Sequence, residues 1–206
     1  GVKFTEDIQI RVLKKKIHPW ASRAGIKLDF AIKEFGVNLN NRICADFGAS
    51  TGGFTDVLLT GGASLVYAVD VGKGLLNWRI YKHKKVRVCD NTNVRFLSLE
   101  QLDPKITLIT CDLSFISICK ALKNIVKEKY TNLSIIALIK PQFELSKDKI
   151  GKNGIVSNEQ YRNDAVSNIK KWFLANDWKI MNLAESPIQG NKGNTEYLIY
   201  CKQENY

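Results

Sequence analysis

The stretch of this sequence that most clearly indicates a binding site is glycine-rich and reads DFGASTGGFT, at residues 46–55. A short apolar run at 43–45 precedes it and an apolar-periodic segment follows it, which predicts a strand, a turn and a helix. That arrangement presents backbone N–H groups and a helix N-terminus to a ligand. The glycines matter because a Cβ atom would hold the backbone away from such a ligand.

The order of residues in this stretch favours one kind of ligand over another. A dinucleotide site usually reads GxGxxG, where the second glycine lets a pyrophosphate approach. Here an acidic residue, Asp46, is followed by GxxxGG. We therefore expect a ligand that lacks a pyrophosphate and carries a cationic or amine group near Asp46, and S-adenosylmethionine fits this description. An ordinary glycine-rich turn is the alternative.

Polar side chains also stand at the ends of the other predicted strands. They are Asp70, the loop at 91–93, Asp112 and Lys140. In a parallel sheet the carboxyl ends of the strands meet at one edge, where ligands bind, so we expect these side chains to converge on the glycine-rich stretch. Asp70 lies about 20 residues beyond the glycines, where an acidic side chain can bind the hydroxyls of a ribose.

The rest of the chain alternates between strand and helix patterns. Strands are predicted at 65–70, 86–89, 106–111, 133–139, 178–184 and 197–201, and helices at 22–35, 75–81, 116–129 and 157–175. Ser22 is a predicted N-cap, and Ser157 with Gln160 resembles a capping box. The alternation predicts an α/β fold with a doubly wound, mostly parallel sheet.

Composition bounds the class of protein. A chain of 206 residues with 45% hydrophobic and 25% charged residues is typical of one soluble domain. The longest apolar run, at 133–139, is far shorter than the roughly 20 residues that span a bilayer, and no secretory signal is present, so we expect a cytoplasmic protein.

The net charge of +11 suits a polyanionic partner. Five scattered cysteines without a CxxC pair predict neither a metal site nor a disulfide framework.

The motifs SRAGIKL, DFGASTGGFTD, VDVGKG, CDLSFIS, IKPQFE and GNTEYL follow one another along the chain. In this order they resemble the TlyA-type proteins, also called hemolysin A, within the FtsJ-like ribosomal RNA 2′-O-methyltransferases. The resemblance covers roughly residues 20–203. It implies a class I (Rossmann-like) methyltransferase fold, with a seven-stranded, mostly parallel sheet whose last strand is antiparallel. It also implies S-adenosylmethionine as cofactor and methylation of cytidine ribose in ribosomal RNA or a ribosomal subunit, and it leaves the oligomeric state open.

The resemblance further implies a catalytic tetrad of Lys27, Asp112, Lys140 and Glu196. An antiparallel last strand starts at the edge where the parallel strands end, so Glu196 is expected beside the other three. No metal ligands are expected. The expected cofactor-binding residues are Asp46, Gly48, Ala49, Ser50, Thr51, Gly52, Gly53, Phe54, Asp70, Val71, Asn91, Thr92, Asn93 and Asp112.

Lys140 has two alternative roles in this chemistry. Methyl transfer to a ribose hydroxyl requires alignment of the reacting atoms and removal of the hydroxyl proton. A lysine removes a proton only in its neutral form, whereas a free lysine has a pKa of about 10.4. The charges of Lys27 and a sulfonium favour the neutral form, and those of Asp112 and Glu196 favour the ammonium. Lys140 is therefore either the base or a group that orients and stabilises the oxygen.

The sequence departs from the family pattern at its start. Residues 1–20 are expected to form a basic linker or extension, and residues 21–206 the methyltransferase domain. TlyA-type proteins usually carry a small N-terminal RNA-binding module, for which residues 1–20 are too few. Ala24 also stands where family members commonly have a second glycine.

Three other functions compete with the methyltransferase. The first is a membrane-active hemolysin, as the older family name implies, and the second is a non-catalytic RNA-binding protein. The third is a nucleotide-dependent oxidoreductase, which the missing GxGxxG disfavours.

Overall fold

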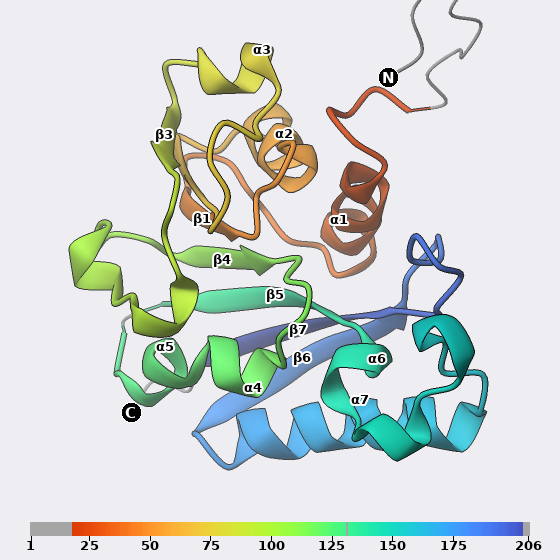
Figure 1. The fold of residues 1–206 in the computed structure, drawn as a ribbon. Coiled ribbons are helices and arrows are strands. Elements are labelled where there is room, and N and C mark those ends of the chain that lie inside the picture. The colour runs from red at the N-terminus through yellow and green to blue at the C-terminus, as the bar shows by residue number, and fades with distance from the viewer. Residues whose placement is uncertain (1–17, 131, 204–206) are drawn as a thin grey trace, which may run out of the picture.

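A single seven-stranded sheet organises the molecule (Figure 1). The computed structural model describes residues 18–130 and 132–203, so the expected N-terminal extension, residues 1–20, lies outside the described residues except for its last three. The strand order is β3-β2-β1-β4-β5-β7-β6. Strand β7 runs antiparallel to both of its neighbours, and the remaining strand pairs are parallel. The predicted fold, with its antiparallel last strand, is confirmed.

The strands are β1 (Ile43–Phe47), β2 (Leu65–Val69), β3 (Val86–Cys89), β4 (Leu108–Cys111), β5 (Ser134–Ile139), β6 (Trp178–Glu185) and β7 (Tyr197–Gln203). The α-helices are α1 (Ala24–Glu34), α2 (Gly53–Thr60), α3 (Trp78–Tyr81), α4 (Ile118–Ala121), α5 (Lys123–Lys127), α6 (Pro141–Glu144) and α7 (Glu159–Leu174). Short 3-10 turns lie at Val94–Phe96, Leu99–Gln101, Lys147–Lys149 and Lys152–Gly154. Within the described residues, none of the helices combines the length and the apolar character needed to cross a bilayer.

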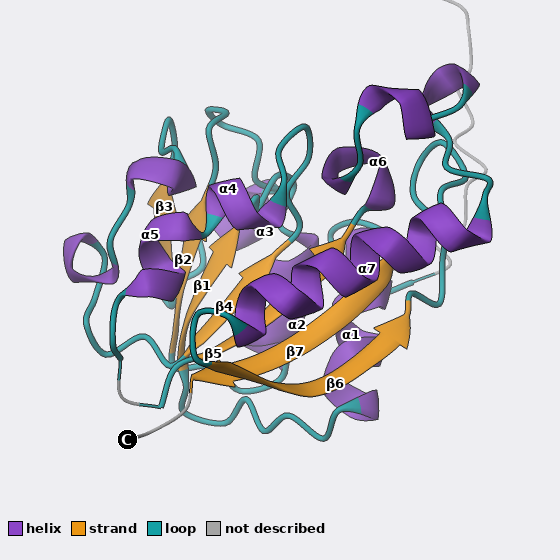
Figure 2. Cartoon of the chain, turned by 90° about the horizontal axis from the view of Figure 1, so that it is seen from below, coloured by secondary structure: helices purple, strands orange, loops and turns teal. Residues whose placement is uncertain are grey.

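Helices cover both faces of the sheet. Leu28 of α1 and Leu58 of α2 pack on one face against strand residues such as Ile136. Ile125 of α5 and Phe173 of α7 pack on the other face. Figure 2 shows α4, α5 and α7 on the near side of the strands, with α1 and α2 behind them. Because successive strand residues point to opposite faces, the central strands are mostly apolar and bury both of their sides; Asp46, Thr110 and Ser134 are the buried polar residues in them.

Asparagine side chains decide where two helices begin. Helix α3 starts only at Trp78, because the Asn77 side chain accepts the backbone N–H of Arg79 at 3.0 Å. Helix α7 is capped by Asn158, which accepts the N–H of Tyr161, and not by the predicted capping box one residue earlier. Asparagine competes well with serine at the N-cap, so sequence alone placed these two helix starts slightly too early.

The predicted cap and length of two other helices are also corrected. Ser22 does not cap α1, which begins at Ala24 without a side-chain cap. The predicted helix at 116–129 is two short helices, α4 and α5, which meet at Leu122, whose side chain is fully buried. Helix α6 was not predicted, although Pro141 at its first position is a common helix start.

Helices α1 and α2 approach each other closely at Gly53. A Cβ atom there would collide with the Ser22 hydroxyl and would lie 3.0 Å from the backbone nitrogen of Gly25. This close approach fixes α1 against the glycine-rich turn. It thereby also fixes the position of Lys27, a buried residue of α1.

We expect Gly53→Ala to destabilise the protein by about 1–3 kcal/mol, because the added methyl group pushes α1 away from α2. Urea denaturation measures this change. Alanine is otherwise the better helix former, so a gain in stability would contradict the close packing of the two helices. Thr60→Ala, at the exposed end of the same helix, is the control and should change stability little.

Candidate active site

The ends of the strands place most of the predicted site. Asp70, Asp112 and Lys140 each follow the last residue of a parallel strand, β2, β4 and β5 respectively. Ile139 at the end of β5 pairs with Tyr197 at the start of β7. Since these two strands are antiparallel, Lys140 and the residue before Tyr197, Glu196, enter the same edge of the sheet side by side.

The glycine-rich turn between β1 and α2 contacts this edge directly. Gly48 and Ser50 have positive φ angles of 81° and 47°. These angles lie in the left-handed region, which residues other than glycine rarely adopt. A Cβ atom on Gly48 would lie 2.7 Å from the backbone oxygen of Asp112. Glycine is therefore required at position 48, because the turn and the loop that follows β4 are in such close contact that no side-chain atom fits between them.

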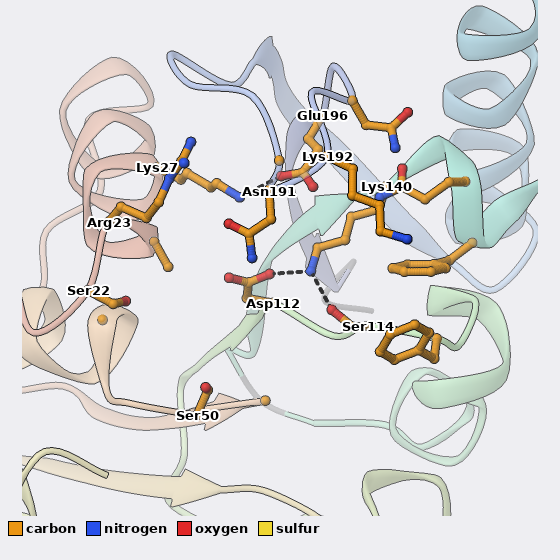
Figure 3. A pocket seen from close by; sticks show the side chains of 18 of the residues that line it. Ser22, Arg23, Lys27, Ser50, Asp112, Ser114, Lys140, Asn191, Lys192 and Glu196 are labelled. Carbon is orange, nitrogen blue, oxygen red and sulfur yellow. Dashed lines mark hydrogen bonds and ion pairs between the residues drawn. The ribbon is translucent and has the colours of Figure 1, made fainter. Parts of the chain in front are cut away.

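The four tetrad residues form two lysine–carboxylate pairs (Figure 3). Lys27 Nζ lies 2.5 Å from Glu196 Oε2, and Lys140 Nζ lies 2.6 Å from Asp112 Oδ1. Lys140 also donates a hydrogen bond of 3.0 Å to Ser114 Oγ. The four side chains are between 3% and 16% exposed. Charges withdrawn from water in this way need partners, and each lysine has one.

All four tetrad residues line one cavity of about 660 Å³. Its wall is completed by the start of α1 and by the loop between β6 and β7. These two segments are joined by Arg23, whose guanidinium donates to the Gln189 carbonyl at 2.7 Å. In Figure 3, Asn191 of the same loop reaches toward the space between the two ion pairs, and Lys192 extends past Lys140 on the far side of that lysine. The cavity therefore has acidic, basic and amide groups around one opening.

A second cavity of about 880 Å³ adjoins the first, and Gly48, Ser50 and Asp112 line both. Both volumes fall in the range of small-molecule sites. The predicted cofactor residues that line one cavity or both are Gly48, Ala49, Ser50, Thr51, Gly53, Phe54, Asp70, Val71, Thr92, Asn93 and Asp112.

Asp70 lies at the wall of the second cavity and holds two loops together. Its Oδ2 accepts the backbone N–H of Ser50 at 2.9 Å, and its Oδ1 accepts that of Gly72 at 2.8 Å. Each carboxylate oxygen can accept more than one hydrogen bond. Asp70 therefore retains the capacity to bind hydroxyl groups in the cavity while it fixes the glycine-rich turn.

Asp46 lies away from both cavities, contrary to the expectation that it meets a ligand. Strand β1 continues beyond Asp46 to Phe47, so the side chain points into the sheet face beneath α2. It is fully buried and accepts hydrogen bonds from Thr55 Oγ1 at 2.7 Å and Thr110 Oγ1 at 3.0 Å. Burial raises the pKa of Asp46 to about 7, although both hydrogen bonds oppose this change.

Two other predicted cofactor residues also lie outside the cavity walls. Gly52 packs against α3, where an added Cβ would approach Ile80 Cδ1 to 2.6 Å. Asn91 occupies a left-handed turn with φ of 53°, and its backbone N–H donates to the Gly72 carbonyl. Both residues shape the turns around the second cavity. Asn93 does line that cavity, but its side-chain oxygen accepts the Arg95 backbone N–H at 3.1 Å.

The structure adds site residues that sequence reasoning did not select. Ser114 contacts Lys140, and Asn194 joins the two loops beside Glu196 by accepting the N–H of Val156 and donating to the Gly154 carbonyl. Ser114 was within reach of prediction, because it belongs to the CDLSFIS motif that contains Asp112. The role of Asn194 depends on a contact between loops about 40 residues apart, which sequence spacing does not reveal.

Within residues 18–130 and 132–203 no group of three or more His, Cys, Asp or Glu side chains is arranged to hold a metal ion.

A family model for FtsJ-like methyltransferases matches residues 20–203. This chain belongs to the FtsJ-like methyltransferase family. The match spans the sheet, both cavities and all four members of the predicted tetrad.

Named relatives of this FtsJ-like chain are similar over most of its length. It is 37% identical to the 16S/23S rRNA (cytidine-2′-O)-methyltransferase TlyA of Mycobacterium tuberculosis, over 90% of this chain and 69% of that protein. It is 39% identical to Hemolysin A of Brachyspira hyodysenteriae, over 97% of this chain and 82% of that protein. A solved structure from Streptococcus thermophilus, of a protein named as a hemolysin, superposes with a TM-score of 0.88 at 35% identity, covering 93% and 70% of the two chains.

The raised pKa of Asp46 predicts a specific pH dependence of stability. Between about pH 4 and about pH 7 the folded chain holds a proton on Asp46 that the unfolded chain has lost. The free energy of unfolding should therefore fall as the pH rises through this window, by up to about 4 kcal/mol. Asp46→Asn removes the titration, so the difference between variant and wild type in urea denaturation should vary with pH. Parallel pH profiles of the two proteins would contradict this account.

The buried pair of Lys27 and Glu196 can be tested by its effect on the stability of the fold, without an activity assay. We expect Glu196→Gln to cost about 3–5 kcal/mol, because Lys27 keeps a buried charge without a partner. Adding Lys27→Met should restore much of the loss in urea denaturation. Asp29→Asn, which breaks the exposed Lys33–Asp29 pair on the same helix, is the control and should cost less than about 1 kcal/mol. Equal costs for the two single variants would contradict the account.

Proposed function

We propose that this chain transfers a methyl group from S-adenosylmethionine to the 2′-hydroxyl of cytidine in ribosomal RNA. The observation that carries the proposal is the pair of Lys140 and Asp112, which lines the same cavity as the pair of Lys27 and Glu196 and whose Asp112 also lines the second cavity. One cavity has groups suited to a nucleoside cofactor, and the other presents paired lysines and carboxylates to a second substrate.

The residues of the second cavity fit S-adenosylmethionine. Asp70 offers carboxylate oxygens to the ribose hydroxyls, and the turn around Gly48 brings its backbone close without side chains in the way. When bound, this cofactor supplies an electrophilic methyl group on a sulfonium. Asp112 lines both cavities, so it stands at the boundary between the proposed cofactor cavity and the proposed acceptor cavity.

The tetrad provides positioning and charge for the acceptor hydroxyl. Lys140 Nζ is held between Asp112 Oδ1 and Ser114 Oγ, so its direction is fixed before a substrate arrives. From there it orients the ribose oxygen and either takes the proton or stabilises the oxygen as the proton leaves. Lys27 and Glu196 form the adjacent wall, where Glu196 holds the Lys27 ammonium in place.

Two aromatic rings in the cavity walls, one of them highly exposed, support an RNA substrate. Phe115 is 92% exposed and adopts a positive φ of 64°, an unfavourable arrangement for a bulky apolar residue. Its ring centroid lies 5.2 Å from that of Phe143, and both residues line both cavities. Splayed bases of RNA stack on such rings, and the net charge of +11 suits the RNA backbone.

The choice of cytidine in ribosomal RNA draws on the relatives. The Mycobacterium tuberculosis protein and one from Campylobacter jejuni, 35% identical over 88% of this chain, are both named rRNA (cytidine-2′-O)-methyltransferases. This substrate also implies a cytoplasmic site of action, where ribosomes are assembled.

We expect Lys140→Met to lower kcat for transfer of labelled methyl groups to unmodified ribosomal RNA by about 100-fold to 10,000-fold. Binding of S-adenosylhomocysteine, measured by calorimetry, should be retained. Lys140→Arg separates the two roles of the lysine, because arginine keeps the charge but does not accept the proton. Lys127→Met, on the exposed side of α5, is the control. Full activity of Lys140→Met would contradict the proposal.

A further inference from the structure

One surface segment outside the tetrad cavity has an unusual composition. Residues 71–89 contain six lysines and arginines and no aspartate or glutamate. The six are Lys73, Arg79, Lys82, Lys84, Lys85 and Arg87. The whole chain has 31 basic and 20 acidic residues, so a stretch of this length with no acidic residue is a local concentration of positive charge.

The same segment exposes large aromatic and apolar side chains. It leads from the end of β2 through α3 to β3, one of the two edge strands of the sheet (Figure 1). Trp78 is 72% exposed and Tyr81 is 54% exposed, on a helix whose Ile80 is only 1% exposed. Lys82 Nζ lies 6.0 Å from the centroid of the Trp78 ring. Trp78, Tyr81 and Lys82 are thus all exposed on or directly after this helix, and we call the segment of residues 71–89 the α3 surface.

Most of the charge on the α3 surface is uncompensated. Arg79 forms an ion pair of 2.7 Å with Asp56, a buried residue of α2. Among residues 18–130 and 132–203, no carboxylate lies within ion-pair distance of any of the other five cations. The Lys85 ammonium donates instead to a backbone carbonyl, that of Ala63. Arg79 and Ile80 thus anchor the helix to the core, and the remaining cations present a positive field to the solvent.

The α3 surface is continuous with the proposed cofactor cavity. Val71 and Leu75, both exposed, line that cavity at the start of the segment. The backbone N–H of Asn77 donates to the carbonyl of Thr51 in the glycine-rich turn at 3.2 Å. A polyanion that reaches the site from this side would therefore meet the α3 surface first.

We propose that the α3 surface docks a single-stranded or looped segment of the substrate RNA, next to the nucleotide that enters the tetrad cavity. The inference rests on the proposed function and adds the face through which the RNA is held. Lysines along the surface neutralise phosphates, and the rings of Trp78 and Tyr81 stack on unpaired bases. Unpaired bases are required, because the bases of a duplex are already stacked on each other.

Direct binding tests this surface separately from catalysis. The probe is a fluorescein-labelled single-stranded RNA oligonucleotide of mixed sequence, titrated with the purified chain at several salt concentrations. The test variant combines Lys73→Gln, Lys82→Gln and Lys84→Gln, whose side chains are exposed. The matched control combines Lys127→Gln, Lys171→Gln and Lys179→Gln, exposed lysines of α5, α7 and β6, and loses the same charge. Trp78→Ala and Trp78→Phe form a second pair of variants.

We expect the test variant to bind the RNA at least about 10-fold more weakly and to reduce the slope of log Kd against log salt by about 2, as for three lost contacts to a single strand. The control should change Kd less than about 2-fold. Trp78→Ala should weaken binding between about 5-fold and about 150-fold, the range for one stacked base, and Trp78→Phe should retain most of the affinity. In the methyl-transfer assay the test variant should raise KM for RNA more than it lowers kcat.

Equal Kd values for the test and control variants would overturn the proposal, even with methyl transfer intact. A surface used by a membrane or by a second copy of the chain would also overturn it. In those cases the test variant would lose binding to anionic phosphatidylserine vesicles, or self-association in sedimentation, while it still bound RNA normally. If no methyl transfer occurs with the wild-type chain, the binding titration still reports on the α3 surface, so the two failures are distinguishable.

Discussion

Two lysine side chains are held almost entirely out of water at one edge of the sheet, and each is paired with a carboxylate at close range. This pairing constrains the rest of the fold. The four side chains come from α1, from the ends of β4 and β5, and from the residue before β7. An error of a few ångströms in the placement of any of these elements would leave a buried charge without a partner.

The packing around the site fixes these elements at two places. The register of β5 and β7 pairs Ile139 with Tyr197, which sets Lys140 and Glu196 side by side. The close contact of Gly53 with the start of α1 sets the distance of Lys27 from the sheet, and Gly48 admits the backbone of Asp112. The same turn therefore shapes the proposed cofactor cavity and locates Lys27 and Asp112, so the two proposed parts of the site share one structural element.

Sequence reasoning was sufficient for features that depend on local pattern. The alternation of apolar runs with a glycine turn predicted the sheet, and strand ends predicted the positions of Asp70, Asp112 and Lys140. It was insufficient for Asp46, because strand β1 is longer than its apolar run and the acidic side chain is buried inside it. The pattern of apolar residues does not show that two threonines, one of them 64 residues away, hold this carboxyl group.

The division of the tetrad into pairs also lay beyond the sequence. The motifs place Lys27, Asp112, Lys140 and Glu196 at one edge, but which lysine meets which carboxylate depends on where α1 docks and on the reach of each side chain. The same holds for Ser114, which orients Lys140 only because the loop after β4 turns back toward β5. Contacts between loops of distant sequence position follow from tertiary packing, and a single sequence records them weakly.

The position of the transferred methyl group tests the central claim most directly. Ribosomal RNA that lacks the modification is incubated with the chain and with S-adenosylmethionine that carries a deuterated methyl group, and the RNA is then digested to nucleosides for mass spectrometry. The account predicts that the label appears on the ribose of cytidine, as 2′-O-methylcytidine. Label on a base, or no label although S-adenosylhomocysteine binds, would contradict it.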